Sequence, residues 1–75
     1  MQQLKDVIVR DDMTFCVSTV VLPFAAMRGA EYETMIFRAD YFGEIVDFAD
    51  LYCDRYGSPE AAAAGHARAV AEWVP

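Results

Sequence analysis

The sequence predicts an α+β domain, in which a small antiparallel sheet of three to five strands carries one C-terminal α-helix packed on one face. Two observations predict this class. β-Branched and aromatic residues alternate through the first half of the chain, and a capped, alanine-rich segment closes it. The 75 residues form one domain, 1–75, and 56% of them are hydrophobic, which is more than a disordered segment carries.

Two β-prone runs open the chain. Residues 4–9 end in Val7-Ile8-Val9, and the charged residues 10–12 that follow are typical of a turn. Residues 13–22 form the strongest strand prediction. One face of this strand holds Phe15, Val17, Thr19 and Val21, and the other holds Thr14, Cys16, Ser18, Val20 and Leu22. Neither face is purely polar, so we expect this strand to be central, and Pro23 to end it.

Residues 24–30 predict a connection to a second long strand at residues 31–38. In that strand Tyr32, Thr34 and Ile36 alternate with Glu33, Met35 and Phe37. Glu33 lies on the solvent face in the ordinary interpretation, or forms a structural contact with Arg55 or a neighbouring backbone across the sheet. The runs 13–22 and 31–38 together predict an antiparallel hairpin.

Residues 40–56 allow two interpretations. Apolar residues at helical spacing, opposite a row of acids and followed by Gly57, predict a helix. The alternative is a turn at 40–43, a strand at 44–48 and a strand at 51–56. Periodicity favours the helix, whereas the Asp, Tyr, Phe, Val and Ile content is only moderately helix-forming.

The C-terminal segment predicts a capped helix. Ser58 is a favoured N-cap, Pro59 suits the first helical position, and Glu60 complements the helix dipole. Gly65 predicts a close approach of the helix to the sheet. The expected buried stripe consists of Ala63, His66, Ala67, Val70, Trp73 and Val74. The expected core includes Phe15, Val17, Ile36, Phe37, Val70 and Trp73.

Three motifs occur in a recognisable order: V-S-T-V at 17–20, E-T-M-I-F at 33–37, and R-Y-G-S-P-E-A-A-A-A-G-H at 55–66. Over residues 13–74 the chain resembles a group of short proteins from tailed phages and prophages. The resemblance implies a phage origin, short strands before the R-Y pair, and no assigned activity. It therefore favours the strand interpretation of 40–56. The group often has a histidine-bearing loop where this chain has V-L-P-F at 21–24, so the resemblance brings no metal site.

His66, Cys16 and Cys53 are the candidates for reaction chemistry. His66 could act as a general base or metal ligand, but no partner residues stand at a recognised spacing, so we expect a partly buried imidazole bonded to the sheet. We interpret both cysteines as small, reduced core residues, with a disulfide only if they lie on neighbouring strands. We therefore expect no enzyme activity, no cofactor and no metal.

The net charge of −6 argues against direct binding of nucleic acid. Five acids stand close together in the segment that ends before Arg55, and aromatic residues interleave with them. The predicted partner-binding residues are Asp40, Tyr41, Glu44, Asp47, Asp50, Tyr52 and Asp54, with Phe42, Phe48 and Tyr56 as further aromatic residues nearby. The alternative is a solvated acidic face.

The functional hypothesis is a small acidic phage-type protein that acts stoichiometrically on a host protein. In its most specific form it is an anti-CRISPR inhibitor that mimics nucleic acid and blocks a basic DNA-binding surface. We expect it in the host cytoplasm, because no signal peptide or membrane span is visible. A phage structural or assembly protein working as a homo-oligomer, such as a homodimer, is the alternative. A small metal-dependent enzyme using His66 is the third hypothesis.

Overall fold

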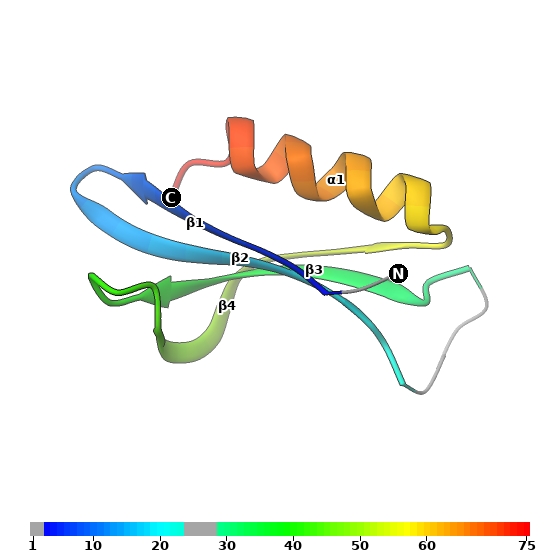
Figure 1. Cartoon of the computed structure of the whole chain (residues 1–75), viewed down its shortest axis with the longest axis horizontal. Coiled ribbons are helices and arrows are strands. Elements are labelled where there is room, and N and C mark those ends of the chain that lie inside the picture. The colour runs from blue at the N-terminus through cyan, green and yellow to red at the C-terminus, as the bar shows by residue number, and fades with distance from the viewer. Residues whose placement is uncertain (1–2, 24–28) are drawn as a thin grey trace.

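The computed structural model describes residues 3–23 and 29–75, which form an antiparallel sheet with a helix across one face (Figure 1). The elements of these residues are β1 (Leu4–Arg10), β2 (Met13–Val21), β3 (Tyr32–Ala39), β4 (Ile45–Tyr56) and α1 (Pro59–Glu72). The strand order is β1-β2-β3-β4, so each strand pairs with the next one in the chain. The predicted α+β class, with its C-terminal helix, is confirmed.

Among the described residues, no helix has both the length and the apolar character needed to cross a membrane.

A tight turn joins β1 to β2. Asp11 and Asp12 adopt φ values of 52° and 62°, which is the left-handed pair that a two-residue type I′ hairpin requires. Arg10 therefore pairs with Met13, and Ile8 pairs with Phe15. The turn predicted from the charged residues 10–12 is confirmed, although neither of its central residues is the glycine that usually stands there.

β2 and β3 are the two central strands of the sheet, and they pair antiparallel as predicted. Val17 lies opposite Ile36 and Thr19 lies opposite Thr34, and this face of β2 receives α1. Leu22 N–H donates to Glu31 O at 2.8 Å just beyond the strand ends. The predicted connection at 24–30 falls largely on residues 24–28, which lie outside the described residues.

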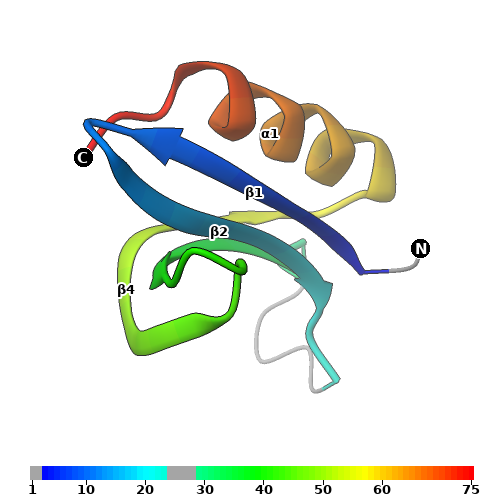
Figure 2. The same cartoon turned by 60° about the vertical axis from the view of Figure 1, so that its left-hand side comes forward.

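Residues 45–56 form one long strand, so the helical interpretation of this segment is wrong. The two predicted short strands are joined into one, and the register against β3 shifts twice near Arg38. Tyr52 pairs with Ile36 and Asp47 pairs with Arg38, which leaves extra residues on β4 between these pairs. These bulges bend the strand, and its first half curls away on the side of the sheet opposite α1 (Figure 2).

The cap of α1 is the predicted one. Ser58 Oγ accepts the Ala61 N–H at 3.1 Å, and proline occupies the first turn. The predicted stripe is partly wrong, because Ala63, Ala67 and Val74 are exposed while Ala62, Gly65, His66 and Ala69 are buried.

The smallest residues decide which face of α1 meets the sheet. A Cβ on Gly65 would overlap the phenol end of Tyr56, so glycine lets the helix pack directly against this side chain of β4. The close approach predicted for Gly65 is confirmed. The helix is therefore rotated toward its small residues, and Val70 and Trp73 are only partly buried.

The core lies between α1 and the sheet. Its buried members are Ile8, Phe15, Val17, Ile36 and Ala69, with Tyr52, Val70 and Trp73 packed against them. The rings of Phe15 and Trp73 meet edge to face with centroids 4.9 Å apart. Phe37 is buried on the opposite face, where its ring lies 5.5 Å from that of Phe48.

Candidate binding surface

The predicted partner-binding residues do not share one surface. Asp40 belongs to the turn before β4, where its Oδ1 accepts the N–H groups of Phe42 at 2.9 Å and Glu44 at 3.0 Å. Glu44, Asp47 and Asp50 are exposed along the turn and the first half of β4. Asp40 therefore shapes the turn, and the next three acids are exposed to a partner, although Asp47 Oδ1 also accepts the Ala49 N–H at 2.9 Å.

Tyr52 and Asp54 lie on the face that carries α1. They stand opposite Ile36 and Thr34, whose side chains are buried under the helix. Asp54 Oδ2 accepts a hydrogen bond from Tyr56 Oη at 3.2 Å. Burial, followed by the neighbouring Tyr52 and Asp54, raises the pKa of Tyr56 to about 12, so the phenol remains a donor. These two predicted residues are thus separated from the other five.

The most prominent exposed feature is apolar. Within residues 40–51, here called the β3–β4 segment, Tyr41 is 89% exposed, Phe42 85% and Phe48 74%. Val46 and Leu51 are also largely exposed. Contiguous exposed apolar residues of this size mark interaction sites more often than scattered single ones do. Sequence reasoning named Tyr41 but did not select Val46 or Leu51, because their spacing in the sequence does not show which apolar residues the fold leaves exposed.

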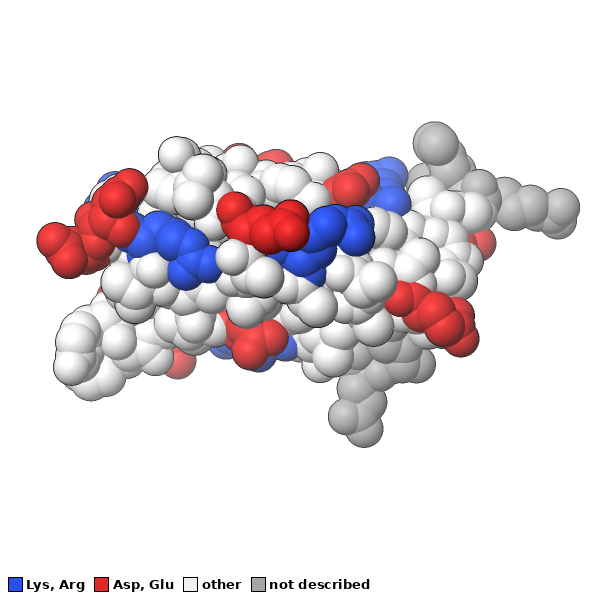
Figure 3. Space-filling model, turned by 90° about the horizontal axis from the view of Figure 1, so that it is seen from above, with Lys and Arg blue, Asp and Glu red and all other residues white. Residues whose placement is uncertain are grey.

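Charge follows the same segment. The β3–β4 segment contains four acids, Asp40, Glu44, Asp47 and Asp50, and no lysine or arginine. The view onto α1 is different, since acidic and basic side chains lie next to one another there (Figure 3). The segment is therefore the part of the described surface where acids and large apolar side chains coincide.

A chain of hydrogen bonds runs from β1 through His66 into the sheet. His66 Nε2 lies 2.7 Å from Asp6 Oδ2, and His66 Nδ1 lies 2.7 Å from Thr19 Oγ1. Thr19 Oγ1 in turn lies 2.5 Å from Thr34 Oγ1. The interpretation of His66 as an imidazole bonded to the sheet is confirmed.

The charge of the imidazole sets the direction of this chain. With a neutral imidazole, Nε2–H donates to the Asp6 carboxylate, Thr19 donates to Nδ1, and Thr34 donates to Thr19. Every hydrogen then has an acceptor. The order of hydroxyl, imidazole and carboxylate is that of a hydrolase triad, but the Thr19 side chain is 0% exposed, so a substrate has no access to its oxygen. The chain of bonds holds α1 on the sheet.

The two cysteines differ from one another. Cys16 is buried, as expected of a core residue, whereas Cys53 is exposed, so that prediction is wrong for Cys53. Both thiols are free, and they belong to β2 and β4, which are not neighbours. Burial is the main cause that raises the pKa of each thiol, and Glu33 raises that of Cys53 further. Neither cysteine has the lowered pKa of a reactive thiolate.

Glu33 forms the structural contact with Arg55. The Arg55 Nε–H donates to Glu33 Oε2 at 2.9 Å, and Glu33 is only 8% exposed. The solvent-face interpretation of Glu33 is therefore wrong. Among residues 3–23 and 29–75, no three His, Cys, Asp or Glu side chains are grouped so that they could hold a metal ion.

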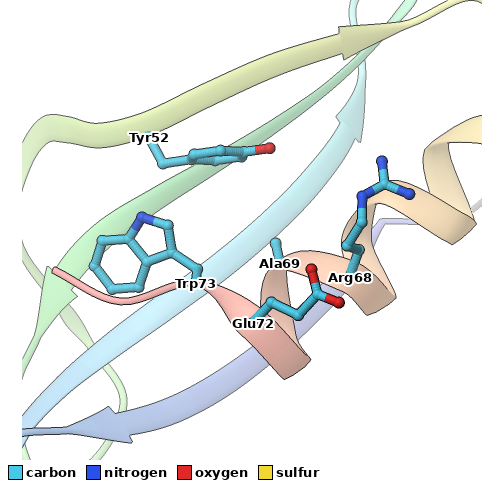
Figure 4. A pocket seen from close by; sticks show the side chains of 5 residues that line it. All are labelled: Tyr52, Arg68, Ala69, Glu72 and Trp73. Carbon is cyan, nitrogen blue, oxygen red and sulfur yellow. The ribbon is translucent and has the colours of Figure 1, made fainter.

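A small cavity of about 200 Å³ opens between α1 and β4. It is lined by Tyr52, Arg68, Ala69, Glu72 and Trp73 (Figure 4). The rings of Tyr52 and Trp73 form its aromatic wall, and Arg68 and Glu72 reach toward it from the helix. A space of this size holds one side chain rather than a cofactor.

Comparison of the chain with protein-family models, with curated proteins and with solved structures found no match.

Proposed function

We propose that this chain is a non-enzymatic binding protein that docks on a protein partner through the β3–β4 segment. The observation that carries the proposal is the exposure of Phe42 at 85% and Phe48 at 74% within a segment that holds acids and no base. Aromatic side chains dominate the energetics of protein interfaces, and surrounding polar groups select the partner.

The negative charge of the β3–β4 segment indicates which kind of partner surface it would bind. The exposed acids Glu44, Asp47 and Asp50 alternate along the segment with its exposed apolar residues, so a complementary surface combines apolar and basic groups. Nucleic-acid-binding proteins present such basic surfaces. A second copy of the same segment would oppose acids to acids, which disfavours self-association at this site.

A host protein is the partner that the phage-like motif order supports. In this form the protein acts stoichiometrically, and its acids occupy a basic DNA-binding surface, as in an anti-CRISPR inhibitor. Since Tyr52 and Asp54 lie on the α1 face, we assign the contact to the segment itself and leave these two residues out of it.

The test is affinity capture from a bacterial lysate with matched baits. The first test bait carries Glu44→Gln, Asp47→Asn and Asp50→Asn, which remove three negative charges. Asn at position 47 keeps the acceptor for the Ala49 N–H, and Asp40 is left alone because it holds the turn. The second test bait carries Phe42→Ala and Phe48→Ala. The control bait, Glu60→Gln with Glu72→Gln, changes two exposed acids on α1.

We expect the wild-type and control baits to retain the same basic, nucleic-acid-binding protein, and both test baits to lose it. Because the contact is partly electrostatic, retention should fall steeply as salt is added. Equal capture by all baits, or capture of no basic protein, would contradict the proposal. Capture of the chain's own copies alone would favour the homo-oligomer.

A further inference from the structure

The outer edge of β1 is free in the described residues. β1 pairs with β2 on one side, and no other described strand pairs with it. Exposed edges of this kind accept another strand, because their backbone N–H and C=O groups lack partners. Val7 and Val9 are 50% and 61% exposed on this strand, on the face opposite α1.

Residue parity restricts how a second copy could add to this edge. Ile8 is in the core, and Asp6 and Arg10 bond to residues of α1 or just after it, so even-numbered residues of β1 face the helix. Lys5, Val7 and Val9 face the other way. In a twofold-symmetric antiparallel pair of strands, the α1 faces of both copies lie on the same side of the joined sheet. Even-numbered residues therefore stand opposite even-numbered ones, odd-numbered residues stand opposite odd-numbered ones, and the twofold axis passes through a residue.

Charge selects one of these registers. With the axis at Val7, charged residues face apolar ones: Lys5 faces Val9 and Asp6 faces Ile8. With the axis at Val9, Asp6 faces Asp12, and with the axis at Asp6 that residue faces itself. Only an axis at Ile8 opposes opposite charges within β1. The strand pairs are then Asp6 with Arg10, Val7 with Val9, and Ile8 with itself, and Lys5 faces Asp11 of the turn just beyond the strand.

The groups needed for this register are available. Asp6 uses Oδ2 for His66, which leaves Oδ1 as an acceptor, and its side chain is 56% exposed. Arg10 donates to the carbonyl oxygens of Val9, Val70 and Trp73, which uses three of the five guanidinium N–H groups. No bond within the described part of the chain involves the Lys5 ammonium group.

We infer that two copies of this chain pair through β1, in antiparallel register about Ile8, to form a continuous sheet. The dimer does not depend on the proposed partner. It leaves the β3–β4 segment of each copy on the face opposite α1, where the start of the segment reaches Val7 of β1. A dimer would therefore present two docking surfaces to a partner, which increases avidity for a repeated or symmetric target.

A charge swap at the ends of the strand tests the register. Lys5→Glu places two acids opposite each other in the dimer, and Asp11→Lys places two bases there. The double variant restores opposite charges. Lys5 lies near the start of β1 and Asp11 lies in the turn that follows the strand, so they do not meet within one copy, and rescue can occur only between copies. Glu60→Lys, at an exposed position of α1, is the matched control.

Sedimentation equilibrium of the full chain measures the outcome, with circular dichroism to check folding. We expect a wild-type dimer that each single variant weakens about tenfold in Kd. The double variant should have a Kd within about threefold of the wild-type value, and the control variant should have the wild-type Kd. A wild-type monomer at every concentration would overturn the inference, and so would a dimer that the swap does not rescue.

Discussion

The two faces of the sheet are covered in different ways. On the α1 face, Phe15 and Ile36 are buried and the polar chain through His66 satisfies its own hydrogen bonds. On the opposite face, the curled start of β4 covers Phe37 but leaves Phe48 and its neighbours exposed. The α1 face forms a core, whereas the opposite face has large apolar side chains that the described residues leave exposed. We therefore expect substitutions on the first face to change stability and those on the second to change binding.

A matched pair of Phe→Ala substitutions gives the largest contrast. Phe15 is 1% exposed and packs against Trp73, so Phe15→Ala should cost about 3–5 kcal/mol of unfolding free energy. Phe48→Ala removes one contact with Phe37 and should cost less than about 1 kcal/mol. Urea unfolding measures both. Similar losses would show that the curl of β4 is as much a core as the α1 face.

Substitution of the two buried threonines under α1 should give the second-largest effect on the free energy of unfolding. Thr19→Val leaves His66 Nδ1 without its donor and Thr34 without its acceptor, so it should cost about 1–3 kcal/mol. Thr34→Val removes one bond and leaves Thr19 still donating to His66, so about 1 kcal/mol should be lost. Equal costs in thermal unfolding would contradict the direction assigned to the hydrogen bonds.

Gly43 tests how the segment is held on the opposite face. It has φ +84°, and a Cβ there would lie 2.8 Å from Val7 Cγ2. Gly43→Ala should cost about 1–2 kcal/mol through the left-handed backbone alone, and should loosen the turn from β1. Gly29→Ala is the control, because it has the same φ and no atom within 4 Å of the added Cβ. If Gly43→Ala costs no more unfolding free energy than Gly29→Ala, the contact between the turn and Val7 contributes nothing to stability, which would contradict this account.

Thiol labelling gives the smallest effect. Because burial and Glu33 raise the pKa of Cys53, its labelling at pH 8 should be slower than that of a free thiol and should keep rising at higher pH. Glu33→Gln should lower that pKa and speed the reaction. Arg55→Gln should slow it, since Arg55 favours the thiolate. Labelling of Cys53 at the rate of a free thiol, unaffected by Glu33→Gln, would contradict this account.

Local patterns were sufficient to predict much of the fold. The alternation in residues 13–22 and the sequence Ser58-Pro59-Glu60 indicated β2 and the start of α1, because pleat periodicity and capping are local effects. Residues 40–56 were ambiguous for a physical reason. The bulges in β4 interrupt its alternation, so its apolar residues fall at spacings that also fit a helix.

The surroundings of His66 depend on long-range pairing. Asp6 lies 60 residues away in the chain and Thr19 lies 47 away, so their meeting follows from strand register and helix rotation together. The exposure of Phe42 and Phe48 likewise depends on how β4 bends. The acidic and aromatic composition of the segment was visible in the sequence, whereas the separation of Tyr52 and Asp54 from it was not.

Hydrogen–deuterium exchange of the intact chain, with and without the protein captured by wild-type bait, tests the central claim most directly. If the β3–β4 segment is the docking surface, residues 40–51 should gain protection on binding while α1 stays unchanged. Protection confined to α1, with residues 40–51 exchanging as they do in the free protein, would contradict it.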